Sequence, residues 1–317
     1  MVVVHRPAHG NSFIGLDVGG TFLKGALIDR DGAVIERLHQ PVAKATADEL
    51  FDQLTGAIRT LEKKEAAGAV GVGLPGIVDQ AGARLRVAPN VPVLNGLPVG
   101  HEIERRTGRR TFLENDANAA ALAEAWLGAG HGAENLLFVT LGTGIGAGVV
   151  LGGRVWSGAS GYAGELGHIQ VDPDGIRCGC GSWGCVETVA GAPNWARVAE
   201  KLLAGRSSSL SGRELDPEVI AEAAKSGDAV ALEVVQGVAR ALGWGIAAAL
   251  NLLNVERVVI GGGVAAAGPF LLDRITEEAR RRLFAQTFAD STFCLAELGA
   301  DAGVIGAARA GMVALAR

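Results

Sequence analysis

A short segment from Gly164 to Glu187 concentrates residues that can bind a metal. Cys178, Cys180 and Cys185 follow a C-x-C-x4-C spacing, and His168 lies ten residues upstream. Three thiolates and one imidazole are a ligand set of closed, tetrahedral Zn²⁺ sites, in which the metal holds the fold together and does not polarise a substrate. A disulfide, or thiols buried as small apolar groups in a glycine-rich turn, are the alternatives. The clustering of the ligands favours structural zinc.

The same segment bears on substrate chemistry. A zinc-ligating histidine binds the metal through one ring nitrogen and offers the other nitrogen to a partner. His168 would therefore be fixed in orientation and could face a substrate hydroxyl, with Glu165 and Glu187 flanking the segment.

Two glycine-rich loops separate apolar stretches. Gly19-Gly20-Thr21 follows a strand expected at residues 13–18, and the loop from Gly142 to Gly146 follows a strand expected at 136–141. Glycine admits positive φ and lets an anion approach the backbone N–H groups. Neither loop matches the Walker motif or the dinucleotide fingerprint. The first loop alone could be a plain hairpin turn, but the pair predicts a polyphosphate held between two domains.

Two aspartates lie where strands are expected to end. Asp116 is the third residue of the run ENDAN, which follows a strand expected at 111–113. Because α/β proteins usually place their chemistry at such ends, its carboxylate is predicted to take a proton from a substrate hydroxyl, although the run also suits a helix N-cap. Asp17, at the first glycine loop, could orient Mg²⁺ through water or could bond its own backbone in a turn.

Strands and helices alternate along the chain. Thr46 and Glu49 form a capping box before a helix expected to end near Gly68, and Asp216 and Asp228 are expected to cap two later helices. The segment 88–98 is too rich in proline for a helix or a central strand. Further strands are expected at 25–28, 33–38, 69–74, 147–151, 257–260 and 292–298, and further helices at 101–107, 119–127, 270–283 and 303–316. The order strand, glycine tip, strand occurs twice and predicts two related α/β halves.

Composition limits the classes of function. The chain has 317 residues, a net charge of −5 and a pI of about 5.7, which argues against a nucleic-acid or anionic-membrane surface. The apolar opening Met1–Val4 is too short for a signal peptide, and the uncharged stretch 241–255 is shorter than the roughly 18 residues of a membrane span. We therefore expect a cytoplasmic protein with reduced thiols, in which Cys294 is a core thiol.

Together these motifs resemble those of the ROK family of sugar kinases and repressors. The resemblance rests on DVGGT from Asp17, ENDAN from Glu114, LGTGIG from Leu141, ELGH from Glu165 and the run C-G-C-G-x-x-G-C-x-E, and it covers nearly the whole chain. It implies an α/β fold of the actin-like, hexokinase type, with two ribonuclease-H-like domains and with ATP and sugar in the interdomain cleft. The smaller domain is expected over residues 1–120, with a C-terminal helix at about 303–317 packed back on it. The larger domain, with the zinc loop, is expected over 121–302.

The resemblance also implies roles for individual residues. Asp116 is the expected catalytic base. The residues expected to bind the sugar are Gly76, Asn90, Asn115, Glu165, His168 and Glu187. The residues expected to bind ATP and Mg²⁺ are Asp17, Gly19, Gly20, Thr21, Lys24, Gly142, Thr143, Gly144, Gly261, Gly262 and Gly263, the last three against adenosine. The expected zinc ligands are His168, Cys178, Cys180 and Cys185.

The expected activity is transfer of a phosphoryl group from ATP to the 6-hydroxyl of glucose, because the likeness to bacterial glucokinases includes ENDANAAALAE from Glu114. Fructose, mannose and N-acetylmannosamine kinases share the same skeleton, and the loop 88–98 departs from the glucokinase pattern, so another hexose is the alternative. The donor could also be another nucleotide or polyphosphate. The family suggests a homodimer.

Two non-enzymatic alternatives are weaker. Repressors of the family carry an N-terminal winged helix-turn-helix, and too few residues precede Phe13 for any DNA-binding fold. A sugar-binding module without catalysis would need a damaged phosphate loop or a replaced Asp116, and both are intact.

Overall fold

A computed structural model describes residues 11–43, 45–79 and 83–316. The opening residues, on which the expectation about a signal peptide depends, lie outside this range. The chain divides into two compact units: unit 1 comprises the chain up to Ala123, Ser157–Tyr162 and the part from Ala300 on, and unit 2 comprises Glu124–Trp156 and Ala163–Gly299. The segment Ser157–Tyr162 thus packs with unit 1, although it falls in the range 121–302 assigned above to the second domain.

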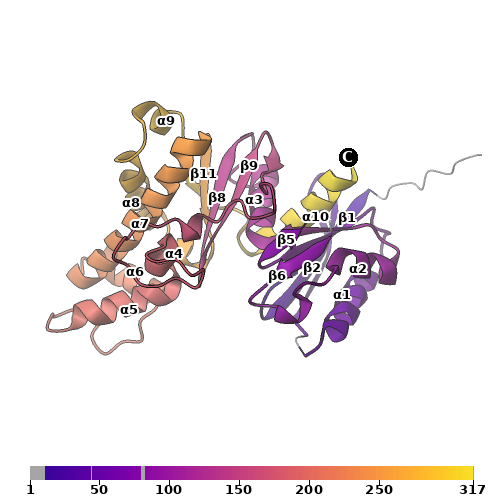
Figure 1. Cartoon of the computed structure of the whole chain (residues 1–317), viewed down its shortest axis with the longest axis horizontal. Coiled ribbons are helices and arrows are strands. Elements are labelled where there is room, and N and C mark those ends of the chain that lie inside the picture. Colours follow the sequence, from indigo (N-terminus) through magenta and orange to yellow (C-terminus); the bar gives the residue numbers. More distant parts are fainter. Residues whose placement is uncertain (1–10, 44, 80–82, 317) are drawn as a thin grey trace, which may run out of the picture. The chain divides into compact units, whose positions relative to one another are not determined.

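Unit 1 is built on a five-stranded sheet in the order β3-β2-β1-β4-β7. Strands β1 and β2 of this sheet are labelled in Figure 1. Strands β1, β2 and β3 pair antiparallel, and β4 and β7 add in parallel to β1. The strands are β1 (Ser12–Val18), β2 (Phe22–Asp29), β3 (Val34–Pro41), β4 (Val70–Leu74) and β7 (Thr111–Asn115), with a separate hairpin of β5 (Ile77–Asp79) and β6 (Arg84–Val87). The helices are α1 (Ala47–Leu61), α2 (Val99–Thr107), α3 (Asp116–Leu127), which runs on into unit 2, and α10 (Ala302–Leu315), with short 3₁₀ turns at Pro92–Leu94 and Gly299–Asp301.

The two faces of this sheet differ because side chains alternate along each strand. Ile14, Leu16 and Val72 belong to the buried cluster that includes the apolar side chains of α1 and α2. Gly15 and Gly71 instead face α10, where an added Cβ would lie 2.0 Å from the carbonyl oxygen of Val304 and 1.7 Å from that of Ala307, respectively. Glycine on this face therefore lets α10 lie directly on the backbone of the sheet.

Several boundaries in unit 1 differ from the expectations. Helix α1 begins at the predicted cap, where Thr46 Oγ1 accepts the N–H of Glu49, but it ends at Leu61 and not near Gly68. The hairpin β5–β6 was not predicted, because its short strands carry no long apolar run. Residues 88–98 are loop as expected, except for one 3₁₀ turn at Pro92–Leu94.

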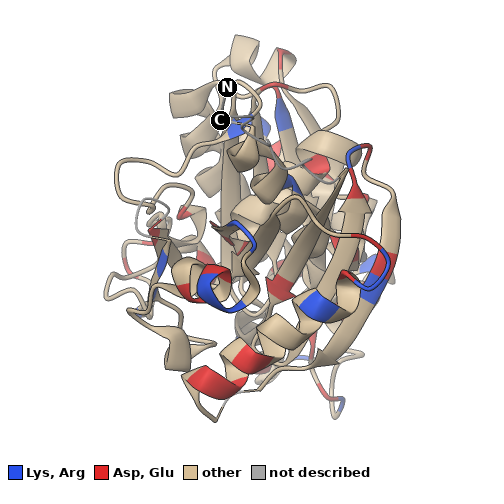
Figure 2. Ribbon diagram, turned by 90° about the vertical axis from the view of Figure 1, so that its right-hand side faces the viewer, with Lys and Arg blue, Asp and Glu red and all other residues tan. Residues whose placement is uncertain are grey.

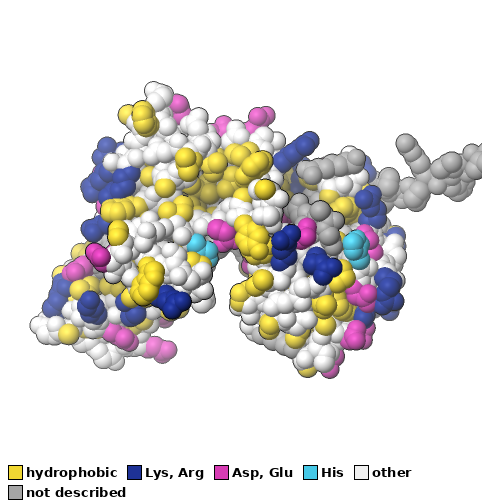
Figure 3. Space-filling model, in the orientation of Figure 1, with side chains coloured by type: hydrophobic (Ala, Val, Ile, Leu, Met, Phe, Trp, Pro, Cys, Tyr) yellow, Lys and Arg dark blue, Asp and Glu magenta, His cyan; other side chains and the backbone are white. Residues whose placement is uncertain are grey.

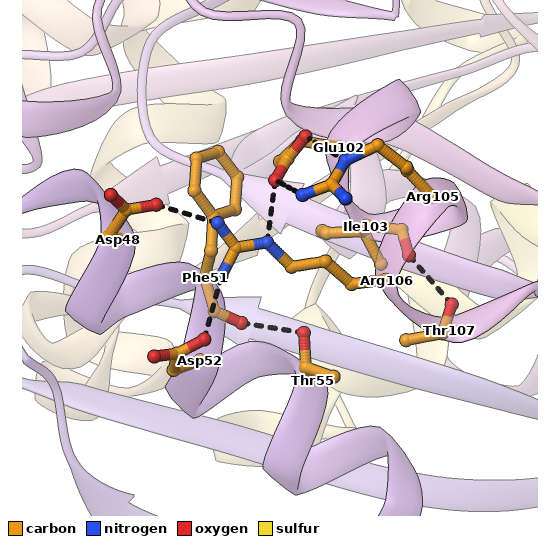
Figure 4. Close-up of polar contacts among 9 residues, drawn as sticks. All are labelled: Asp48, Phe51, Asp52, Thr55, Glu102, Ile103, Arg105, Arg106 and Thr107. Atoms are coloured by element: carbon orange, nitrogen blue, oxygen red, sulfur yellow. Dashed lines mark hydrogen bonds and ion pairs between the residues drawn. The ribbon is translucent and has the colours of Figure 1, made fainter.

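A polar cluster joins α1 to α2 (Figure 4). The guanidinium of Arg106 donates to Asp48, Asp52 and Glu102 at 2.6–2.7 Å and lies over the ring of Phe51, 5.1 Å from its centroid. The Arg106 side chain is only 17% exposed, whereas Arg105 is 68% exposed and, within the described part of the chain, forms an ion pair only with Glu102. Bonds from Arg105 and Arg106 lower the pKa of Glu102 to about 2.

We expect Arg106→Ala to lower the free energy of unfolding by about 1–2 kcal/mol, because it removes both the packing of the arginine stem and three charge-assisted contacts at a partly solvated surface. Arg105→Ala is the matched control and should have a much smaller effect. Urea unfolding followed by circular dichroism measures both variants, and equal destabilisation would contradict the central role of Arg106.

Unit 2 repeats the topology of unit 1. Its sheet has the order β10-β9-β8-β11-β12, with β8, β9 and β10 antiparallel and β11 and β12 parallel to β8. The strands are β8 (Leu136–Leu141), β9 (Ile145–Leu151), β10 (Arg154–Val155), β11 (Arg257–Gly261) and β12 (Thr292–Leu295). The prediction of two related α/β halves is thereby confirmed, although β12 ends at Leu295 and not at Leu298.

Helices around the long α7 complete the core of unit 2 (Figure 1). They are α4 (Val186–Ala190), α5 (Ala192–Leu203), α6 (Pro217–Lys225), α7 (Ala229–Leu253), α8 (Pro269–Arg280) and α9 (Ala285–Ala289), with 3₁₀ turns at Leu166–His168 and Gly263–Ala267. Asp228 caps α7 through the N–H groups of Val230 and Ala231, and Asp216 caps α6 through that of Val219. Among the described residues, α7 alone is long and apolar enough to span a membrane, but 61% of its most apolar window is buried, as in the central helix of a soluble core.

Charged and apolar side chains are distributed differently on the surface. Basic and acidic positions are interspersed in Figure 2, and several form ion pairs one helical turn apart, such as Lys225 with Glu222. Figure 3 shows apolar side chains on the visible face of unit 2. The large apolar residues of unit 2 that are most exposed are Trp156, Ile176, Trp183, Leu252 and Phe284.

Candidate functional site

The four predicted metal ligands come together in unit 2. The ligand atoms of His168, Cys178, Cys180 and Cys185 all lie within 4.8 Å of one another. The sulfur atoms of Cys180 and Cys185 are 3.8 Å apart, and His168 Nδ1 lies 3.5 Å from the sulfur of Cys178. Zn–S bonds of about 2.3 Å and a Zn–N bond of about 2.0 Å give tetrahedral edges of about 3.8 and 3.5 Å. The donor set and its spacing therefore fit Zn²⁺, while a disulfide would need sulfur atoms about 2.05 Å apart.

Tight backbone turns hold these ligands in place. The N–H of Cys178 bonds to the carbonyl of Ser182, and the N–H of Gly181 bonds back to the carbonyl of Cys178. Gly184 has φ +57°, and a Cβ on it would lie 1.5 Å from the carbonyl oxygen of Asp172. The glycines of this segment thus allow two segments of backbone to lie in contact beside the ligand cluster.

The second ring nitrogen of His168 faces Glu165. Its Nε2 lies 3.7 Å from Glu165 Oε2, while Nδ1 faces the thiols. At this distance the contact is electrostatic and is not a hydrogen bond, so Glu165 lies beside the imidazole without fixing its tautomer. The structure thus brings together two of the residues expected on the sugar side.

Glu187 joins the ligand cluster to the second glycine loop. It lies on α4, two residues after Cys185, and its Oε2 accepts the N–H of Ile145 at 3.0 Å. A Cβ on Gly144 would lie 2.4 Å from the same oxygen, so a larger residue there would displace the Glu187 carboxylate from its place beside the loop. A residue predicted to bind the sugar is therefore also a support of the predicted phosphate loop.

A cavity of about 420 Å³ opens beside this loop. Gly142, Thr143 and Gly263 line it, so residues from two segments predicted to bind the nucleotide share one cavity. Gly262 has φ +88° and lies against the backbone of Leu141, which precedes the glycine loop. Gly261 is buried, and a Cβ added to it would lie 2.9 Å from the ring of Phe138.

Three carboxylates of the same cavity were not predicted as site residues. Asp216, Glu218 and Glu222 line it from the first two turns of α6. The sequence identified Asp216 only as a helix cap, a role that the structure confirms through the N–H of Val219. The Asp-Pro-Glu start of the helix marks where α6 begins, but no pattern shows that its first turn faces a cavity.

In unit 1, Asp116 is the first residue of α3, at the end of β7. Asn115 acts as the helix cap, because its Oδ1 accepts the N–H groups of Ala117 and Asn118. The surroundings of the Asp116 carboxyl group remove water from it and raise its pKa to about 6; the bond from the N–H of Ala117 opposes this rise, and the charge of Asp17 adds to it. The residue as a whole is nevertheless exposed at the surface of unit 1.

The other predicted sugar-side residues of unit 1 surround this point. Asn115 Nδ2 donates to the carbonyl of Gly76 at 3.0 Å. Gly76 has φ +108°, and a Cβ on it would lie 2.0 Å from the carbonyl oxygen of Val87, so its backbone needs glycine. Asn90 is exposed, and its Cβ would lie 3.4 Å from a Cβ on Gly20. The first glycine loop therefore lies next to Asn90.

Asp17 and Lys24 lie opposite each other on β1 and β2. Burial raises the pKa of Asp17, and the positive charge of Lys24 opposes that rise. Gly303, in the first turn of α10, approaches Asp17 so closely that a Cβ would lie 2.6 Å from its Oδ2. The ammonium of Lys24 donates to the carbonyl of Ala300 at 3.2 Å, so in this structure it bonds to the chain that leads into α10.

The expectation that glycine provides positive φ in the two loops is wrong. Gly19, Gly20, Gly142 and Gly144 adopt no left-handed φ. The first loop closes through the N–H of Gly19 on the carbonyl of Phe22 at 3.0 Å. The absence of a side chain, and not positive φ, is what lets neighbouring groups approach these loops.

Comparison with known proteins agrees with these observations. The model of the ROK family matches residues 13–311 of the chain. The chain belongs to the ROK family. A glucokinase from Thermotoga maritima is 35% identical over 93% of this chain and 95% of its own length. The regulator NagC of Escherichia coli K12 is 35% identical over 83% of this chain, which covers 66% of that protein.

Solved structures of ROK proteins share the fold. The ROK hexokinase from Thermus thermophilus is 36% identical, with a TM-score of 0.86 and coverage of 96% of this chain and 99% of that one. A ROK glucokinase from Streptomyces griseus, solved with glucose and AMPPNP, is 34% identical, with a TM-score of 0.77 and coverage of 95% and 99%. These neighbours confirm the actin-like ATPase fold for this ROK chain.

Proposed function

We propose that the protein is an ATP-dependent hexose kinase that phosphorylates the 6-hydroxyl of glucose. The observation that carries this proposal is the carboxyl group of Asp116, which directly follows β7, has a pKa raised to about 6 and is not needed as a helix cap. The similarity to glucokinases supports glucose as the acceptor and ATP as the donor. A kinase for another hexose is the alternative, because the loop 88–98, which carries Asn90, departs from the glucokinase pattern.

In unit 1, Asp116 is the proposed base that takes the proton of the attacking hydroxyl. Asn115, Gly76 and Asn90 are proposed to orient the sugar, since they lie on the loops around Asp116 or beside the first glycine loop. Gly19, Gly20 and Thr21 are proposed to offer backbone N–H groups to phosphate oxygens. Lys24 could bind a phosphate oxygen only after releasing its hydrogen bond to the carbonyl of Ala300.

In unit 2, the cavity at Gly142, Thr143 and Gly263 is the proposed nucleotide site. Gly144, Gly261 and Gly262 support the loops that form it, and Glu165, His168 and Glu187 are the proposed contributors to sugar binding. Phosphoryl transfer depends mainly on positioning and on stabilising charge, so these residues need to orient groups and exclude water. When bound, Mg²⁺ neutralises phosphate oxygens, and the half-buried carboxylate of Asp17 is a suitable oxygen ligand for it.

The pKa of Asp116 predicts the pH dependence of the reaction. Only the carboxylate form can accept a proton, and burial raises the pKa of this group to about 6. We therefore expect kcat/KM to be near its maximum above about pH 7 and to fall about tenfold for each pH unit well below pH 6. Initial rates between pH 4.5 and 8 in buffers of constant ionic strength measure this. A flat profile across pH 6 would contradict Asp116 as the base.

The decisive experiment compares glucose, mannose, fructose and N-acetylmannosamine at fixed Mg·ATP, with ADP release coupled to NADH oxidation. We expect the highest kcat/KM with glucose and identify the product as the 6-phosphate by NMR. A different best sugar would support the alternative hexose. Sugar binding by calorimetry without ADP release would instead indicate a sensor, as in the regulatory branch of the family.

The remaining parts of the proposal are a structural zinc ion at His168 and the three cysteines, a homodimer, and a cytoplasmic enzyme of carbohydrate metabolism that feeds glycolysis. The ligand geometry supports the zinc. Exposed apolar residues on the helices after the zinc loop, such as Leu252, are proposed to contact a second copy, which light scattering after gel filtration tests.

A further inference from the structure

We infer that the carboxylates of α6 make the enzyme select a nucleoside triphosphate and reject inorganic polyphosphate as the phosphoryl donor. The inference rests on the proposed function, because it concerns the same cavity of unit 2. Asp216, Glu218 and Glu222 line this cavity together with Gly142, Thr143 and Gly263. The other lining residues carry hydrocarbon side chains, and neither lysine nor arginine is among the described residues that form its wall.

The two kinds of donor place different groups in this cavity. With the reacting phosphates at the glycine loop, a nucleotide fills the space beyond them with an uncharged ribose and base. Their hydroxyl and amino groups are donors that a carboxylate accepts. A polyphosphate chain would instead place further phosphates there, each with a negative charge, opposite three acidic side chains. Repulsion between these like charges inside a recess makes the binding of polyphosphate less favourable.

The N-terminus of α6 adds to this preference for a nucleotide over polyphosphate. The N-terminus of a helix normally attracts phosphate, because its free N–H groups and the helix dipole favour an anion. Here Asp216 Oδ1 accepts the N–H of Val219 at 2.8 Å, and Glu218 lies in the same turn. The protein's own carboxylates therefore occupy the position that a phosphate would take.

Lys225 compensates only part of this charge. Its Nζ donates to Glu222 Oε1 at 2.6 Å, one turn along the helix, and Lys225 does not line the cavity. Asp216 and Glu218 face the cavity without such a cation among the residues that line it. The discrimination should therefore depend mainly on these two residues.

The test compares Mg·ATP with short-chain inorganic polyphosphate, each with glucose, for the wild-type enzyme and for the variant Asp216→Asn, Glu218→Gln, Glu222→Gln. Asparagine still caps a helix, so α6 should persist. For the wild type we expect kcat/KM with ATP to exceed that with polyphosphate by at least about a hundredfold. In the variant this ratio should fall at least about tenfold, and added salt should narrow the wild-type ratio by screening the charges.

The matched control replaces three exposed carboxylates of unit 2 that do not line the cavity, Glu200→Gln, Asp273→Asn and Asp290→Asn. It has the same change in net charge and should keep the wild-type ratio. A wild-type enzyme that uses both donors equally would overturn the inference, and so would a variant whose ratio is unchanged or changes no more than that of the control.

Calorimetric binding of AMPPNP and of tripolyphosphate separates this inference from the proposed function. Absence of phosphoryl transfer from every donor would refute the kinase. Tighter binding of AMPPNP than of tripolyphosphate would still support selection by the cavity, whereas equal binding of the two would refute it.

Discussion

Replacing Asp116 by asparagine is expected to lower kcat at least about a hundredfold while leaving the affinity for the sugar nearly unchanged. The amide has almost the shape of the carboxyl group and can still accept the N–H of Ala117, but it cannot take a proton from a hydroxyl. Helix α3 should form normally, because Asn115 and not Asp116 provides its cap.

Three measurements separate catalysis from folding in this variant. Steady-state kinetics give kcat, and calorimetry gives the affinity for the sugar. Thermal unfolding should show a midpoint at least as high as that of the wild type, because the substitution removes a desolvated charge beside Asp17. Asp31→Asn, at an exposed turn of the same unit, is the matched control and should keep full activity. Near-normal turnover in Asp116→Asn would refute its role as the base.

The second large effect is expected from Cys180→Ala, which should lose both the bound zinc ion and the affinity for the sugar. Structural zinc contributes folding free energy to the loop that binds it, and three remaining ligands hold the metal far more weakly than four. Cys180 is exposed, so its truncation leaves no cavity in the core and the loss of metal can be separated from a packing defect.

Mass spectrometry of metals should find one zinc ion per wild-type chain and none in this variant. Cys294→Ala is the matched control: its thiol lies on β12, outside the ligand cluster, and the variant should keep both metal and sugar binding. Full sugar affinity in a metal-free preparation would contradict the structural role of the metal.

The sequence predicts those parts of the molecule that local chemistry decides. The grouping of His168 with the three cysteines was predicted, because thiols and an imidazole at such spacing have few other uses. The repeated order of strand, glycine tip and strand led to two similar sheets, since the same hairpin begins each. Asp116 stood out because it follows a short strand within a polar run.

Features that depend on tertiary contacts were not predictable. The hairpin β5–β6 is formed by strands of three and four residues, which are too short for a sequence pattern to identify. Ser157–Tyr162 packs with unit 1, where a Cβ on Gly161 would lie 2.4 Å from the carbonyl oxygen of Val78. From the sequence, Glu218 and Glu222 are expected to be ordinary surface residues of an amphipathic helix. Only the packing of α6 beside the second glycine loop turns them toward a cavity.

The bond from Ile145 to Glu187 has a practical consequence for anyone who purifies this protein. Glu187 follows Cys185 by two residues. Removal of the proposed zinc ion by a chelator would therefore disturb the second glycine loop through the short stretch of chain that carries the sulfur atoms. On the proposed zinc site, a sample stripped in this way would lose affinity for both substrates, and adding zinc back should restore it.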